Sequence, residues 1–205
     1  MKRETTPSKV TDKIMELCVG IVADTDPVYI PVSVMEWSMP KECFPNVQRM
    51  VQEHGGKQIN GWAIWQWANI LVEAEAHSVW ENSEGQLIDI TPHDNGEREI
   101  LFLRDDNMVY SMEQIGSIRI ALTDSPLAAE LIELSEKTEE IMGEYKPGTK
   151  IPVAELQRKL TAATGIQKAG TDGSAEPKDG KKRSMSLSIR TEVQEVLWEV
   201  SSYDI

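Results

Sequence analysis

The sequence is poor in cysteine, in basic charge and in long apolar runs. Only two cysteines occur among 205 residues, Cys18 and Cys43, too few for a disulfide framework, so we expect free thiols in a reducing cytoplasm. Lys and Arg number 21 against 34 Asp and Glu, and the net charge of −13 argues against generic binding to nucleic acid or anionic membrane. The sequence contains no run of about 18 apolar residues that would predict a transmembrane helix. Its charged start leads into no apolar stretch typical of a secretory signal.

What is present is the composition of a soluble globular protein, with 40% hydrophobic and 27% charged residues. Hydrophobic periodicity predicts helices over 10–24, 44–54, 125–143 and 151–165, an extended edge segment over 26–34, and strands over 60–67, 70–80, 85–91 and 99–105. Short turns separate the strands, so neighbours are expected to pair antiparallel. The sequence therefore predicts an α+β fold, a small antiparallel sheet packed with helices.

The composition changes after the last predicted helix of this domain. Residues 166–184 carry almost no apolar side chain and are predicted to be a flexible linker. Beyond them, Thr191 and Gln194 fit a capping box in front of a short amphipathic helix within 185–205. The expected organisation is one domain over 1–165, a linker and a terminal helix.

The strand over 70–80 carries unexpected charge. Its odd-numbered face consists of Leu71, Glu73, Glu75, His77 and Val79. If that face meets water, the charges are an ordinary solvated sheet surface. Apolar side chains flank the charged ones on the same face, however, and this favours a partly buried polar site. Both interpretations stay open at this point.

A cysteine can complete such a site. Cys43 falls at the predicted start of the helix over 44–54, and a helix N-terminus with a nearby imidazolium favours thiolate, the nucleophilic form of cysteine. His77 is then the candidate general base, and Asp89, on the strand expected beside it, is the candidate that orients the imidazole. Glu75 is a weaker candidate for that orienting role, because side chains two apart on one strand point in parallel.

The order of these residues resembles that of papain-like and transglutaminase-like proteins, over about 40 to 105. The matching pieces are "CFPNVQRMV", "AHSVW" and "GQLIDITP". The resemblance implies a papain-like or transglutaminase-like core with Cys43 as nucleophile, His77 as general base and Asp89 as orienter. The block "GWAIWQW…EAEAHSVW…GQLIDITP…ILFLRDD" is also similar to a set of uncharacterised bacterial and phage proteins. Some of these carry a cysteine-rich zinc-binding tail, which has no counterpart here.

These residues predict a cysteine hydrolase or acyl transferase that acts on an amide-type bond of a peptide or protein, with no cofactor and no bound metal. A second hypothesis is a non-catalytic protein-binding domain, a pseudoenzyme or acidic interaction protein that uses the tryptophan-rich sheet and binds a basic partner. A third is a metal site built from Glu73, Glu75, His77 and Asp89, with His93 as a further nitrogen ligand. The first two hypotheses differ in whether Cys43 is reactive.

Overall fold

The computed structural model describes residues 5–111, 115–145 and 152–164 of the chain. The chain divides into two compact units, Met1–Asp124 and Ser125–Ile205, and each is described by itself. The domain expected over 1–165 contains the whole first unit and part of the second. The predicted linker over 166–184 and the predicted terminal helix over 185–205 lie outside the described residues.

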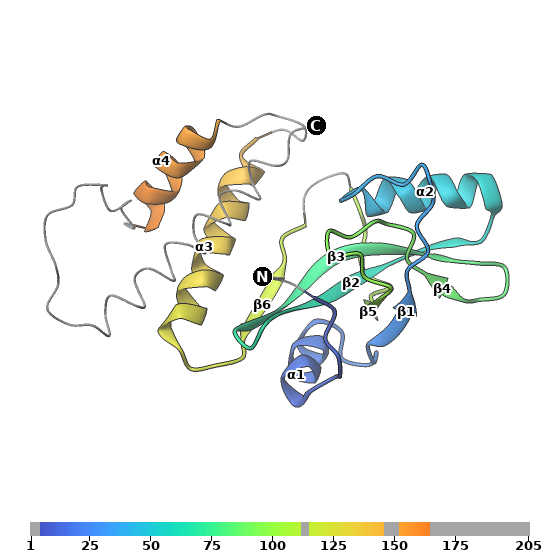
Figure 1. Ribbon diagram of the computed structural model, residues 1–205, viewed down its shortest axis with the longest axis horizontal. Coiled ribbons are helices and arrows are strands. Elements are labelled where there is room, and N and C mark those ends of the chain that lie inside the picture. The colour runs from blue at the N-terminus through green and yellow to red at the C-terminus, as the bar shows by residue number, and fades with distance from the viewer. Residues whose placement is uncertain (1–4, 112–114, 146–151, 165–205) are drawn as a thin grey trace, which may run out of the picture. The chain divides into compact units, whose positions relative to one another are not determined.

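The first unit is an antiparallel sheet with two helices, which confirms the α+β prediction (Figure 1). Its elements are α1 (Asp12–Ile21), β1 (Val28–Pro31), α2 (Cys43–His54), β2 (Lys57–Trp67), β3 (Leu71–Glu81), β4 (Leu87–Ile88), β5 (Glu99–Arg104) and β6 (Ile118–Ala121). The strand order is β1-β5-β2-β3-β4, and β6 pairs with β3. Every strand pair is antiparallel, and β2 and β3 form the long central ribbon. The sequence patterns did not predict β6.

The two ends of this sheet come together, so that it is nearly closed into a barrel. The Ser33 N–H donates to the Asp89 carbonyl oxygen at 2.8 Å, and the Asp89 N–H donates to the Pro31 carbonyl oxygen at 3.0 Å. These bonds join the chain after β1 to the chain after β4, through a bridge between Val32 and Asp89. The backbone of Asp89 is thus held on both sides.

Apolar residues of the sheet form two clusters on opposite strand faces. The even-numbered Trp62 and Ile64 of β2 pack with α1, in the cluster Ile14, Leu17, Cys18, Trp62, Ile64, Val72, Ala74, Leu101 and Leu103. The odd-numbered face of the central ribbon contributes to the cluster Ile30, Ile59, Ala63, Trp65, Val79, Ile100 and Phe102. Glu73 and His77 lie on this second face and are buried. The interpretation of that face as a solvated surface is therefore wrong for these two residues.

Helix α2 packs beside the Glu81 end of the central ribbon, whereas α1 lies nearer its Leu71 end (Figure 1). The buried positions of α2 fall at helical spacing, and Val47 and Met50 contact Ile90 just after β4. The helix ends at Gly55, whose φ of 73° lies in the left-handed region that favours glycine. This packing holds the first turn of α2 close to β3 and to the residues after β4.

Gly61 of β2 offers a test of this packing. A methyl group at this position would lie 2.2 Å from the Leu103 carbonyl oxygen and 2.8 Å from the Phe102 ring, which is fully buried. We expect Gly61→Ala to lower the free energy of unfolding by about 1–3 kcal/mol, since the backbone must shift to admit the methyl group. Urea denaturation measures this change.

Gly20→Ala is the matched control for that substitution. Gly20 lies in α1 with no atom within 4 Å of the added methyl group, and alanine is the better helix former. This variant should be as stable as the original protein or more so. Equal stability of the two variants would contradict the close approach of β5 to Gly61.

In the part of the second unit that the structure describes, the chain forms α3 (Pro126–Gly143) and α4 (Val153–Thr164), as the sequence patterns predicted for these residues. They pack through a small buried cluster of Leu134, Ile141, Leu156 and Leu160. Among the described residues, no helix combines the length and apolarity needed to cross a membrane.

Candidate functional site

Cys43 is the first residue of α2, where the sequence analysis expected a nucleophile. The preceding residue, Glu42, makes no side-chain bond that caps the helix, so its carboxylate does not occupy the helix N-terminus as a cap. Cys43 is 8% exposed. The Cys43 thiol is close enough to the His77 ring to help raise the pKa of that ring through charge and hydrogen bonding. The fold thus brings together two residues that are 34 positions apart in the sequence.

Strand register explains why Asp89 reaches the same histidine. Trp80 pairs with Ile88 and Glu81 with Leu87, and continuing this register places Asp89 opposite Val79, diagonal to His77. The side chains of His77, Val79 and Asp89 therefore point to one face of the sheet. His77 Nε2 lies 3.2 Å from Asp89 Oδ2, but the two atoms are not aligned as a hydrogen bond. Their contact is chiefly one between charges.

A local turn after β4 brings a second histidine to the same carboxylate. Asp89 Oδ1 accepts the Thr91 N–H at 2.9 Å, an Asx-type turn that bends the chain within the sequence "DITP". His93 then follows with its Nε2 2.5 Å from Asp89 Oδ2. One carboxylate oxygen is shared by two imidazole rings, which belong to two of the three histidines in the chain.

Asn46 ties the start of α2 to this turn. Its Oδ1 accepts the Met39 N–H at 3.0 Å, and its Nδ2 donates to the Met39 carbonyl oxygen at 2.8 Å. The same Nδ2 lies 3.4 Å from Thr91 Oγ1. Asn46 is buried, so these bonds form away from solvent. The side chain therefore links the loop before Cys43 with the turn after Asp89 and helps to fix their separation.

The charges of the site reinforce one another. Burial alone would lower the pKa of His77, but Asp89 and Cys43 outweigh it and raise that pKa well above its ordinary value. Burial would raise the pKa of Asp89, but His77 and His93 lower it strongly. Both shifts favour an ionised Asp89 carboxylate next to a protonated His77.

Glu75 and Glu73 have other partners. The Glu75 carboxylate accepts the Trp65 indole N–H at 2.8 Å, which ties it to β2. Although the residue reaches solvent, protein atoms crowd its carboxyl and raise its pKa, an effect that the charge of His77 partly offsets. Glu73 forms a buried ion pair with Arg119 of β6, its neighbour in strand register.

An aromatic pair lies next to the thiol. The Phe44 and Tyr110 rings stack with centroids 3.9 Å apart and an interplanar angle of 6°. Tyr110 lies close enough to Glu42 and Cys43 for their charges to act on it; burial, then these charges, raise its pKa. Tyr110 and Met39 remain exposed, as does Glu42, the residue before Cys43.

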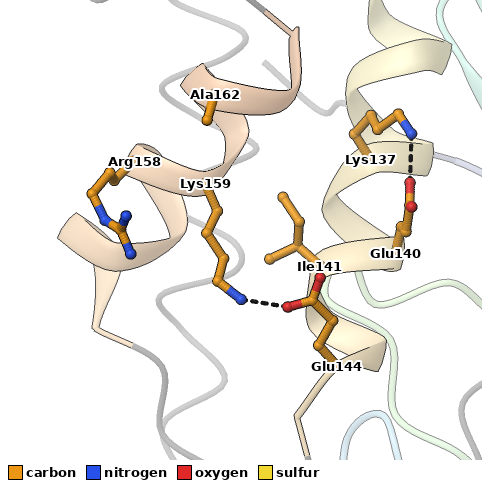
Figure 2. A pocket seen from close by; sticks show the side chains of 7 residues that line it. All are labelled: Lys137, Glu140, Ile141, Glu144, Arg158, Lys159 and Ala162. Atoms are coloured by element: carbon orange, nitrogen blue, oxygen red, sulfur yellow. Dashed lines mark hydrogen bonds and ion pairs between the residues drawn. The ribbon is translucent and has the colours of Figure 1, made fainter.

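The second unit has a groove of a different kind. It lies between α3 and α4 and is lined by Lys137, Glu140, Ile141, Glu144, Arg158, Lys159 and Ala162 (Figure 2). Lys137 bonds to Glu140 at 2.5 Å, and Lys159 bonds to Glu144. The Lys137–Glu140 pair lies within α3, and the Lys159–Glu144 pair joins α4 to the residue that follows α3. We find no nucleophile or imidazole among the lining residues.

Residue type and order thus predicted three residues that the fold brings together, Cys43, His77 and Asp89. They predicted His93 only as a metal ligand and did not indicate Asn46 or Tyr110. The Asp-x-Thr-Pro turn could have indicated that the chain bends back after Asp89, but only the folded sheet shows where the bend leads. The chain matches no protein-family model, no curated protein and no solved structure.

Proposed function

We propose that the protein is a thiol-dependent hydrolase or acyl transferase that acts on an amide-type bond, with a papain-like or transglutaminase-like core. The observation that carries the proposal is the placement of Cys43 at the first turn of α2 beside His77, which in turn contacts the buried Asp89. The chain has the residue order Cys, His, Asp of those families. Its nearly closed antiparallel sheet and the helix that begins with the cysteine also support the proposal.

The ring atoms suggest a division of labour. His77 Nε2 faces Asp89, so Nδ1 is the nitrogen left for the Cys43 thiol. In the reaction we propose, the Cys43 thiolate attacks the substrate carbonyl carbon, and the carbonyl π electrons move to the oxygen. The tetrahedral intermediate then collapses, the carbon–nitrogen bond breaks, and the His77 imidazolium donates its proton to the leaving amine.

A second half-reaction releases the acyl group. The now neutral His77 takes a proton from water, or from an acceptor amine, as that group attacks the thioester carbonyl. Cys43 leaves as thiolate, and His77 is again an imidazolium. Unpaired backbone N–H groups at the start of α2 are the candidates to bind the oxyanion, because the first turn of a helix leaves its N–H groups without intrahelical acceptors. Pro45 supplies no such donor, so the N–H groups of Cys43 and Phe44 would serve.

The surroundings of the thiol favour a peptide or protein substrate. Exposed Met39 and Tyr110 offer apolar contact to a substrate side chain, and exposed Glu42 adds negative charge in a chain of net charge −13. A substrate with basic residues near the reacting amide would complement this surface.

The binding-domain alternative rested on the tryptophan-rich sheet. Trp62 is 8% exposed and Trp65 is 5% exposed, and each belongs to a buried cluster. Their rings therefore serve packing, whereas Trp37, Trp67 and Trp80 are only partly buried. The burial of Trp62 and Trp65 counts against a partner surface at the centre of the sheet.

An activated ester tests the proposal without knowledge of the substrate. With p-nitrophenyl acetate, we expect a burst of nitrophenol of about one per chain, together with an acetyl group on Cys43 in the peptide mass spectrum. His77→Ala should slow the acylation by about 10²–10⁴-fold, the usual range for loss of an acid–base group.

His54→Ala is the control, since His54 is half-exposed at the C-terminal end of α2. It should leave the burst unchanged. A burst that persists in Cys43→Ala, or an acetyl group found only on lysines, would overturn the proposal.

A further inference from the structure

Two histidine rings and one carboxylate converge at a single point of the fold. One ligand atom each from His77, Asp89 and His93 lies within 4.8 Å of the other two. Asp89 Oδ2 is 3.2 Å from His77 Nε2 and 2.5 Å from His93 Nε2. A divalent transition metal at about 2.0–2.2 Å from nitrogen and oxygen ligands requires ligand atoms within about 4 Å of each other. To admit an ion, the His93–Asp89 contact, now at hydrogen-bond distance, would have to open while the most distant ligand atoms close toward that spacing.

An independent observation points to a missing ligand at this position. His77 Nε2 is buried and has no hydrogen-bond partner, although it faces Asp89. A buried nitrogen of this kind is rare, because an unsatisfied polar atom destabilises the fold unless something binds it. In the neutral form of the ring this nitrogen carries a lone pair, which a metal ion between the three side chains would accept, so binding would displace the proton that His77 carries in the metal-free site.

The supporting contacts resemble those that orient metal ligands. Asp89 Oδ1 accepts the Thr91 N–H, and the Asp89 backbone is bonded on both sides. The His93 ring packs edge-on against Trp65, with centroids 5.1 Å apart. Bonds and packing of this type fix the orientation of ligands before the ion arrives.

We propose that His77, Asp89 and His93 form a binding site for a divalent transition metal such as Zn²⁺ or Fe²⁺. Two imidazoles and one carboxylate suit these ions, and three protein ligands leave a coordination position open. The ion would enter beside His93, whose side chain is 13% exposed, because Asp89 is fully buried.

This ligand set differs from the one that the sequence suggested. Glu73 is held by Arg119 and Glu75 by Trp65, so neither belongs to the cluster. Of the groups that strand 70–80 offers, only His77 takes part. The site shares His77 and Asp89 with the thiol site, although Cys43 is not among the clustered ligands, so a bound ion would remove the imidazolium that the proposed thiol reaction uses.

Zinc binding to the full-length chain tests the proposal. After treatment with a chelator, calorimetric titration with Zn²⁺ at neutral pH should show one equivalent bound, and zinc should raise the melting temperature. His93→Ala should weaken binding by at least about 100-fold, more than the loss of a supporting group usually does. A melt without zinc establishes that this variant is folded, since His93 lies near the surface.

Two variants separate this site from other zinc sites. His54→Ala removes the remaining histidine of the chain and should bind zinc as the original protein does. Cys43→Ser should also keep its zinc, whereas zinc bound through the Cys43 thiol would be lost in this variant. The proposal is overturned if the original chain binds no zinc, if folded His93→Ala binds it equally well, or if Cys43→Ser alone loses it. None of these results depends on whether Cys43 is a nucleophile.

Discussion

At about pH 6, iodoacetamide is expected to alkylate Cys43 about 100 times faster than Cys18, because the thiolate is the reactive form. Cys18 is fully buried in the cluster under α1, and burial raises its pKa to about 11. Cys43 is the first residue of α2 beside the imidazole of His77, the placement on which the proposed pair of thiolate and imidazolium rests. Mass spectrometry of the labelled peptides at several times gives the two rates.

His77→Ala should slow the labelling of Cys43 at this pH by about 10-fold or more, because an ordinary thiol with a pKa of about 8.5 is only ~0.3% ionised there. The same variant should regain a fast rate at about pH 9, where an ordinary thiol ionises without help. Asp89→Asn should have a smaller effect, since it disturbs the ring without removing it.

His54→Ala provides the control and should label Cys43 as the original protein does, because its ring lies beside Glu53 at the other end of α2. If the Cys43 rate at about pH 6 is the same with and without His77, no thiolate–imidazolium pair exists. The protein should then be pursued through its binding partners.

Asp89→Asn is expected to lower the free energy of unfolding by about 3–5 kcal/mol, the range found when one partner of a buried ion pair is removed. Asp89 is fully buried, and its carboxylate faces His77 and His93. Asparagine keeps the shape but removes the charge, so the protonated His77 loses its counter-ion. Urea denaturation measures the change.

Asp106→Asn is the matched control. Asp106 pairs with Arg104 at 2.6 Å, but its side chain is 74% exposed. Removing this pair should change stability by less than about 1 kcal/mol, as for other solvated ion pairs. Similar losses in both variants would show that the Asp89 charge is not buried.

The buried pair of Asp89 and His77 predicts how stability depends on pH. Asp89 has a lowered pKa in the folded protein, so its contribution is present above its ordinary pKa and is lost as the pH falls. His77 has a raised pKa, so its contribution is present below its ordinary pKa and is lost as the pH rises through the raised value. The stability difference between the original chain and Asp89→Asn should be largest between about pH 4 and 6.5, the ordinary values of the two groups. A difference that grows steadily up to about pH 9 would contradict this sign.

Local patterns in the sequence predicted most elements of the fold. Period-two alternation and turn residues identified β2, β3 and β5 to within a few residues, and helical spacing identified α1, α2, α3 and α4. The sequence patterns did not predict β6, because its four residues include the charged Arg119 and show little periodicity of their own. Its pairing with β3 depends on contacts far apart in the sequence.

The candidate site divides in the same way. Residue type and order were enough to name Cys43, His77 and Asp89, because a cysteine before a helix and polar residues at alternate strand positions are visible in the chain itself. The sequence does not show whether the odd-numbered face of β3 meets water or protein, since the alternation is identical in both cases. The near closure of the sheet through Asp89 decides that question by burying His77. The return of His93 to the Asp89 carboxylate likewise depends on a turn direction that only the folded backbone specifies.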